Sequence, residues 1–179
     1  TFNSTAIKDV TLYKGTAPSQ YGGRISSVMD VKMNEGNKNE YHFGGSIGLI
    51  SAKADIEGPI VKDKGSFLIA GRTTYADQFL KLSSDEAIKN NQLYFYDLNA
   101  KANYTINENN RIYLSGYSGR DFFKVQNSFG LDWGNITGTL RWNHIWNSKL
   151  FSNTSLIYSD YDYKVSILNE GGDDFSLTS

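Results

Sequence analysis

Cysteine is absent from the 179 residues of the chain, and proline occurs only twice. The first absence excludes a disulfide framework and any chemistry that needs a thiolate. No apolar run approaches the roughly 18 residues that a membrane-spanning helix needs. This does not exclude a membrane, because a strand of a membrane barrel shows only every second residue to lipid. The opening residues "TFNSTAIKDV" lack the basic and apolar regions of a signal peptide, so an exported protein would begin here with a mature or internal segment.

An excess of charge of one sign is also absent. The chain has 18 Lys and Arg against 19 Asp and Glu, which gives a net charge of −1. The basic residues are scattered and form no block or stripe that could follow a phosphate backbone. We therefore expect no nucleic-acid partner.

Aromatic residues and glycine are abundant instead. Phe, Trp and Tyr make up 14% of the chain, and there are 17 Gly, a composition that favours paired strands. The clearest strand is 93–106, where two sets of residues alternate with period two: Tyr94, Tyr96, Leu98, Ala100, Ala102, Tyr104 and Ile106 against Phe95, Asp97, Asn99, Lys101, Asn103 and Thr105. The run 133–146 likewise separates its apolar from its polar residues. The sequence therefore predicts an all-β fold.

Further strands are predicted over 6–14 and 27–34, followed by a polar linker at 35–39. From residue 40 onward we expect seven strands. A change of phase divides 40–58 into two of them, joined by a tight hairpin near residues 48–51, and the others are 66–75, 93–106, 111–123, 133–146 and 150–167. The pattern leaves open which side faces which way in 52–58, 66–75, 111–123 and 150–167.

The connections and the strand lengths point to a membrane barrel. Short links at 59–64, 107–110 and 147–149 alternate with longer ones at 76–92 and 124–132, before a polar end at 169–179. Outer-membrane barrels have short turns at one end and long loops at the other. Several runs reach 12–18 residues, whereas soluble strands have about 5–6 and membrane strands need about 9–11. Aromatic residues lie towards the strand ends, as in interfacial girdles, although aromatic residues also favour strands in general.

The segment "AIKDVTLYKGTAPSQYGGRISSVMDVKMNEGN" (6–37) resembles the end of the plug domain of a TonB-dependent outer-membrane receptor. The resemblance is carried by a strand ending in Lys14-Gly15, a turn with Pro18, the sequence Tyr-Gly at 21–22, and a last strand over 27–34. The following "GGSIGLISAKADIEGPIVKDKGSFLIAGRTTYADQF" (44–79) is similar to the first barrel strands of Bacteroidota-type, SusC-like receptors. On this resemblance the chain is a fragment, because seven strands with two free edges leave backbone groups unpaired in lipid.

The resemblance implies the C-terminal part of a plug domain at 1–36 and the first roughly seven strands of the barrel at 37–179. The complete barrel would have about 22 strands around the plug. It would be located in the bacterial outer membrane, in contact with lipid. Its function would be the energised uptake of a siderophore, cobalamin, peptide or glycan. TonB with ExbB and ExbD would be its partners, together with a possible SusD-like lipoprotein. The implied protein is not an enzyme and needs no cofactor.

The plug turn and its contact with the barrel are assigned to Tyr21, Gly22, Gly23 and Arg24. A buried charge needs a partner, so one hypothesis has Arg24 tied to acidic residues of the lumen, with Asp55 or Glu57 as contributors. The alternative is an arginine in a solvated turn. A passive porin and a soluble β-sandwich remain competing functions, although a porin would lack the plug segment.

No catalytic or metal-binding constellation is expected. His42 and His144 have no neighbours at ligand spacing and are interpreted as wall residues. Asp160 and Asp162, and the loop pair Asp173 and Asp174, lack the oxygen-rich pattern of a calcium loop. They are interpreted as solvated charges.

Overall fold

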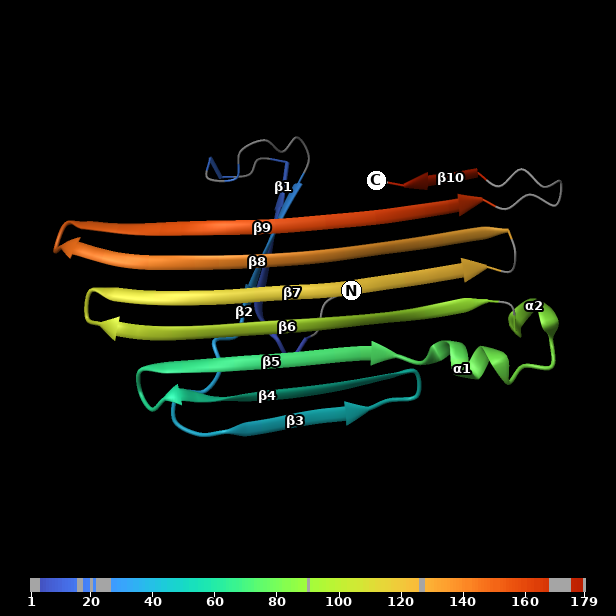
Figure 1. Ribbon diagram of the computed structural model, residues 1–179, viewed down its shortest axis with the longest axis horizontal. Coiled ribbons are helices and arrows are strands. Elements are labelled where there is room, and N and C mark those ends of the chain that lie inside the picture. The colour runs from blue at the N-terminus through green and yellow to red at the C-terminus, as the bar shows by residue number, and fades with distance from the viewer. Residues whose placement is uncertain are drawn as a thin grey trace.

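The computed structural model describes residues 4–15, 18–19, 21, 27–89, 91–125, 128–167 and 175–178. These residues form two antiparallel sheets (Figure 1), which confirms the predicted all-β class. The small sheet pairs β1 (Ile7–Lys14) with β2 (Ser27–Met33). The large sheet contains β3 (His42–Ile47), β4 (Ser51–Val61), β5 (Gly65–Thr74), β6 (Gln92–Asn107), β7 (Asn110–Val125), β8 (Phe129–Asn147), β9 (Leu150–Ile167) and β10 (Phe175–Thr178). Over the described residues this sheet is open, with β3 and β10 at its two edges.

The large sheet is a simple meander in which each strand pairs with the next along the chain. The predicted hairpin between β3 and β4 is confirmed, since the Gly48 amide donates to the Ser51 carbonyl at 2.8 Å. Between β5 and β6 the chain forms two short helices, α1 (Ala76–Lys81) and α2 (Glu86–Lys89). No helix among the described residues is long and apolar enough to cross a membrane.

The connections after β4, β6 and β8 lie at one end of the sheet, on the left in Figure 1. We call this the tight-turn end, because only residues 62–64, 108–109 and 148–149 separate the strands there.

Two predictions about the strands of the large sheet are wrong. The link at 124–132 is mostly strand, because β7 runs to Val125 and pairs with the first residue of β8, Phe129. The count of seven strands is one too low, because β10 pairs with the end of β9.

The two faces of the large sheet differ sharply in chemistry. Residues directly opposite one another in a sheet point to the same face. One such row runs Gly58, Phe67, Ala102, Leu114, Leu140 and Leu156, and the next runs Ile56, Ile69, Ala100, Gly116, Gly138 and Tyr158. We call this side the apolar face. The opposite side, the polar face, carries Ser66, Asn103, Tyr113, Arg141 and Ser155 in one row.

Burial on these faces is the reverse of that in a soluble protein. On the apolar face Leu98 and Leu114 are 50% and 57% exposed, whereas on the polar face Asp97 and Asn103 are only 4% and 2% exposed. Charged and amide side chains are normally the exposed ones. The apolar face is therefore the uncovered side of the described sheet.

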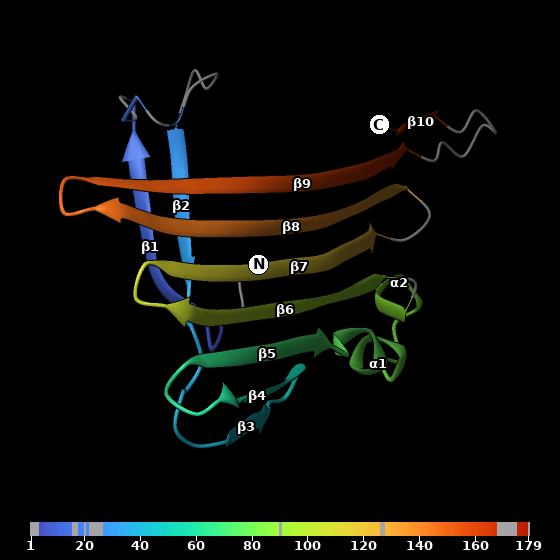
Figure 2. The same ribbon diagram turned by 60° about the vertical axis from the view of Figure 1, so that its left-hand side comes forward.

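The β1–β2 hairpin accounts for part of the burial on the polar face. Its two strands run across the strands of the large sheet, as Figure 2 shows. A small apolar cluster joins the two sheets: Ala6 packs with Leu68 and Ala70 of β5, and Met33 at the end of β2 packs against them. The strands predicted from 6–14 and 27–34 are confirmed. Of the turn between them, the structure describes a hydrogen bond of 2.9 Å from the Tyr21 amide to the Pro18 carbonyl.

Candidate functional site

The polar face holds the end of the hairpin through the backbone carbonyl of Glu35. The Ser66 hydroxyl donates to this oxygen at 2.7 Å, and the Asn103 side-chain amide donates to it at 3.0 Å. The same amide donates to the Ser66 hydroxyl at 2.7 Å. We call Ser66, Asn103 and the Glu35 carbonyl the Glu35 latch. Ser66 and Asn103 can share one acceptor because they are opposite each other on β5 and β6.

The backbone next to the latch requires glycine. Gly36 has a φ of +80°, and a Cβ there would lie 2.3 Å from the Phe67 carbonyl oxygen. Any other residue would be strained by its backbone angle and would collide with β5. The chain can therefore pass this close to the large sheet, which we call the wall, only with glycine at position 36.

Two further sets of contacts fix the chain just before the latch, at Met33 and Asn34. The Lys101 ammonium donates to the Met33 carbonyl at 3.0 Å, again from the wall to a backbone oxygen. Asn34 holds the start of the hairpin, since its backbone amide donates to the Ala6 carbonyl at 2.8 Å and its side chain to the Thr5 carbonyl at 2.9 Å. The large sheet thus binds the main chain of the hairpin at Met33 as well as at Glu35, while Asn34 ties the two ends of the hairpin to each other.

A cavity of about 430 Å³ lies between the hairpin and β6–β8. Four cations line it, Lys8 and Lys32 from the hairpin and Lys101 and Arg141 from the wall, against the carboxylates of Asp30 and Glu35. The Arg141 guanidinium lies 4.5 Å above the Tyr113 ring. Among the described residues its buried Nε has no hydrogen-bond partner.

A second charged cluster lies on the same face, between β5 and β6. Arg72 Nε donates to an Asp97 carboxylate oxygen at 2.8 Å, and the Asn99 side chain donates to the other oxygen at 3.1 Å. The Arg72 and Asp97 side chains are 14% and 3% exposed, so each charge depends on the other. The Arg72 guanidinium also lies 4.8 Å from the Phe95 ring centre.

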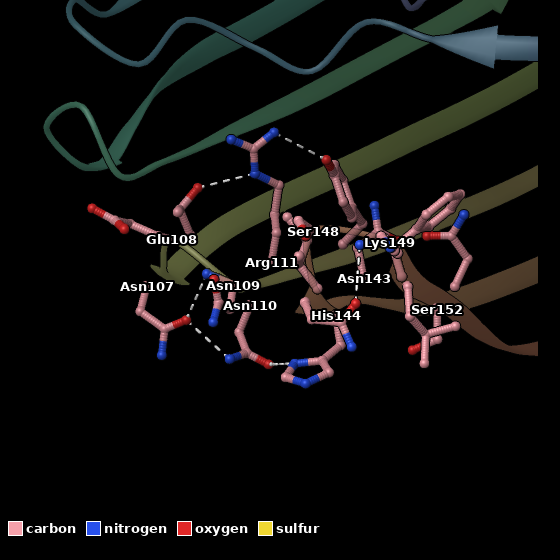
Figure 3. A pocket seen from close by; sticks show the side chains of 17 residues that line it. Asn107, Glu108, Asn109, Asn110, Arg111, Asn143, His144, Ser148, Lys149 and Ser152 are labelled. Carbon is pink, nitrogen blue, oxygen red and sulfur yellow. Dashed lines mark hydrogen bonds between the residues drawn. The ribbon is translucent and has the colours of Figure 1, made fainter.

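A hollow of about 750 Å³ opens at the tight-turn end (Figure 3). Amide side chains order its turns: Asn107 Oδ1 accepts from the Asn109 backbone amide and from the Asn110 side chain. Asn110 Oδ1 in turn lies 2.7 Å from His144 Nδ1 and accepts from the Trp142 indole at 3.0 Å. Arg111 projects from β7 and donates to Thr105 and Tyr113. The hollow is lined mainly by residues of the β6–β7 and β8–β9 turns, and among the described residues the buried Oδ1 of Asn143 in its lining has no hydrogen-bond partner.

The predicted plug turn is described only in part. Tyr21 packs on Tyr13, with ring centres 5.7 Å apart, and lines the cavity beneath the hairpin. Gly22, Gly23 and Arg24 lie outside the described residues. The proposed partners of Arg24, Asp55 and Glu57, belong to β4, whereas β1 ends and β2 begins beyond β9 in both views (Figures 1 and 2). The contact predicted for Arg24 stays a prediction.

The other singled-out residues are separated in the fold. His42 begins β3 and lies 3.0 Å from the Asn37 side chain, while His144 lies on β8 between Trp142 and Trp146. Asp160 and Asp162 belong to β9 and both are exposed, which agrees with their interpretation as solvated charges, and Asp162 also lies 3.4 Å from Arg120. Asp173 and Asp174 lie outside the described residues. Among the residues that are described, no three His, Asp or Glu side chains gather as a metal site would require.

The latch and the cavity were not anticipated from the sequence. The polar alternation in 93–106 marks Lys101 and Asn103 as sharing a face, but nothing local links them to residues 33–35. Ser66 occurs in a run for which the pattern does not show which side faces which way.

A scan against protein-family models finds no match, and searches of curated proteins and of solved structures find none either.

Proposed function

We propose that this chain is part of a TonB-dependent outer-membrane receptor for the energised uptake of a siderophore, cobalamin, peptide or glycan. In this proposal the large sheet is a section of the transmembrane barrel and the β1–β2 hairpin is the end of the plug. The observation that carries it is the reversed burial, with leucines exposed on one face and Asp97, Asn99 and Asn103 buried on the other. Lipid on the apolar face and a plug on the polar face would satisfy both.

The dimensions of the apolar face support a membrane. On β6 its aromatic residues lie at the two ends, Tyr94 and Tyr96 near one and Tyr104 near the other, with Leu98, Ala100 and Ala102 between them. The ten steps from Tyr94 to Tyr104 span about 34 Å at 3.4 Å per residue. A strand tilt of about 40° reduces this to a height of about 26 Å, close to the roughly 25 Å apolar band of outer-membrane barrels.

The two competing functions fit these contacts less well. A passive porin leaves its polar face to water, whereas here that face is bonded to the hairpin through the Glu35 latch. A soluble sandwich needs a second layer over the apolar face, and the described residues supply none. The partners implied by the proposal are TonB with ExbB and ExbD, outer-membrane lipid and, in the SusC-like case, a SusD-like lipoprotein.

Neighbouring positions on β9 offer a matched test of lipid exposure. Ser155 lies on the polar face and Leu156 on the apolar face, and both are exposed in the structure. The chain has no cysteine of its own, so Ser155→Cys and Leu156→Cys each add one reactive thiol to a protein in which any cysteine outside these residues has been replaced by serine. In intact membranes we expect a membrane-impermeant maleimide to label position 155 at least about tenfold faster than position 156, because lipid excludes the reagent. Equal labelling, or recovery of the protein in the aqueous fraction without detergent, would contradict the membrane assignment.

Coupling to TonB needs a cellular measurement. A strain lacking this protein and a strain lacking TonB should lose uptake of the same nutrient within a panel of iron chelates, cobalamin, peptides and glycans. Uptake through this protein that persists without TonB would instead favour the passive barrel.

A further inference from the structure

We infer that the cavity between the hairpin and the wall is a binding site for an oxyanion, either a phosphate or a carboxylate group of a small solute. Its volume of about 430 Å³ falls within the roughly 300–1,000 Å³ that small-molecule sites occupy. The site is formed by the polar face of β6–β8 on one side and by β1 and β2 on the other.

The charges around the cavity are unbalanced in favour of an anion. Among the described residues that line it, Lys8, Lys32, Lys101 and Arg141 face two carboxylates, those of Asp30 and Glu35. The half-buried ammonium group of Lys101 is desolvated, is attracted by the Glu35 carboxylate, and is repelled less strongly by Arg141 and Lys8. Lys32 forms a long and exposed ion pair with Asp9, in which its ammonium nitrogen lies 4.0 Å from a carboxylate oxygen. Like charges in a partly enclosed space oppose one another, and a bound anion would relieve that repulsion.

Arg141 provides the donor for such a group. Its guanidinium is positioned by stacking on Tyr113, and Tyr113 is itself only 8% exposed. Among the described residues the buried Nε of Arg141 is left without an acceptor. A buried donor without a partner is costly, and guanidinium groups bind phosphate and carboxylate oxygens with two parallel hydrogen bonds. An oxyanion in the cavity would accept from the Arg141 guanidinium group, which lines it, and would balance the charge of the nearby Lys101.

Binding can be measured on the complete protein in detergent, with inorganic phosphate as one probe and succinate as the other. Titration calorimetry should show saturable binding of at least one of the two with a dissociation constant of about 1 mM or tighter. Phosphate binding alone would identify a phosphoryl group as the ligand, and succinate binding alone a carboxylate. Arg141→Gln should weaken this binding by about 10- to 100-fold, because a charge-assisted hydrogen bond is lost.

The matched control is Lys53→Gln, which removes the same charge from β4 at a position that does not line the cavity. It should bind the probe as the unmodified protein does. If Arg141→Gln fails to fold, Lys8→Gln tests the same prediction from an exposed position on the hairpin. It should lower the affinity severalfold and weaken its dependence on salt.

Three results would overturn the inference. The first is the absence of saturable binding by either probe. The second is equal affinity in the cavity variant and in Lys53→Gln, which would indicate a general charge effect. The third is an unchanged melting temperature in both probes, because a ligand that binds only the folded state must raise it. None of these measurements involves transport or lipid, so they remain informative if the receptor function proposed above is wrong.

Discussion

Replacing Asn103 by leucine should loosen the hairpin from the wall without removing the wall itself. Asn103 is 2% exposed, and its side-chain amide donates both to the Glu35 carbonyl and to the Ser66 hydroxyl. Leucine has the same number and branching of side-chain heavy atoms but no donor, so Asn103→Leu deletes both hydrogen bonds and leaves Ser66 as the remaining donor to Glu35 within the latch.

The size of the effect follows from the number of bonds that join Asn103 to the hairpin. Only the bond to the Glu35 carbonyl does so, because the bond to Ser66 lies within the large sheet and does not break on detachment. A net hydrogen bond contributes about 0.5–1.5 kcal/mol, so its loss lowers the free energy of detachment by about that amount. Amides in 27–36 that exchange with solvent through detachment should therefore exchange about 2- to 13-fold faster. Adding Ser66→Ala to Asn103→Leu should cost more than the two single changes together, because only the double variant deprives Glu35 of both side-chain donors.

Hydrogen–deuterium exchange of the complete protein in detergent or lipid measures this directly. The control is Asn99→Leu, on the same strand and face, whose amide donates to Asp97 and to no hairpin residue among those described. Asn99→Leu should leave exchange in 27–36 unchanged. The reasoning fails if Asn103→Leu also leaves it unchanged, or if both variants accelerate it equally.

Three further changes test other parts of the fold. Gly36→Ala should lower the free energy of unfolding by well over the roughly 1–2 kcal/mol that a left-handed alanine costs, because its Cβ would also collide with Phe67. Gly15→Ala, at φ +86°, has nothing within 4 Å of its Cβ and should lower it only by that backbone contribution. Denaturant titration of the two variants measures both values. Leu98→Arg, near the middle of the apolar face, should destabilise folding into lipid vesicles by about 2–4 kcal/mol and Tyr94→Arg, near its end, by about 0–1; equal costs would argue against a bilayer. Asp97→Asn should lower the free energy of unfolding by about 3–5 kcal/mol, because it leaves the buried Arg72 charge without this carboxylate. Asp77→Asn, in the partly exposed pair with Lys81, should lower it by under about 0.5 kcal/mol.

Strand positions were largely predictable because they depend on local alternation. The division of 93–106 into two sets of residues is the division between the two faces of β6, and the change of phase at 48–51 is the β3–β4 hairpin. Both signals come from neighbouring residues, which a period of two makes visible.

The missed elements lack that signal. β10 has only four residues, too few for a period of two to stand out from a polar tail. The stretch 124–132 contains Lys124, Ser128 and Gly130, polar and glycine residues that interrupt the alternation and give the appearance of a loop. There the pairing of Val125 with Phe129 extends two long strands that are already aligned by their register.

The hairpin contacts could not be predicted for a different reason. Ser66 and Asn103 lie 31 and 68 residues from Glu35 along the chain. The acceptors are backbone carbonyls, which every residue has, so no side-chain type at positions 33 or 35 identifies them. The glycine at 36 is visible in the sequence, but its reason is the Phe67 carbonyl on another strand.

Recognition of backbone carbonyls also limits how firmly the hairpin is held at this point. Ser66, Asn103 and Lys101 make three hydrogen bonds to Glu35 and Met33. At about 0.5–1.5 kcal/mol each they contribute about 1.5–4.5 kcal/mol, or a preference of about 10- to 2,000-fold for the attached state. That is enough to keep the hairpin on the wall at rest, yet it is less than the 5–15 kcal/mol that holds a typical domain together. A partner that pulls on the hairpin could therefore break these contacts before the strands of the wall separate.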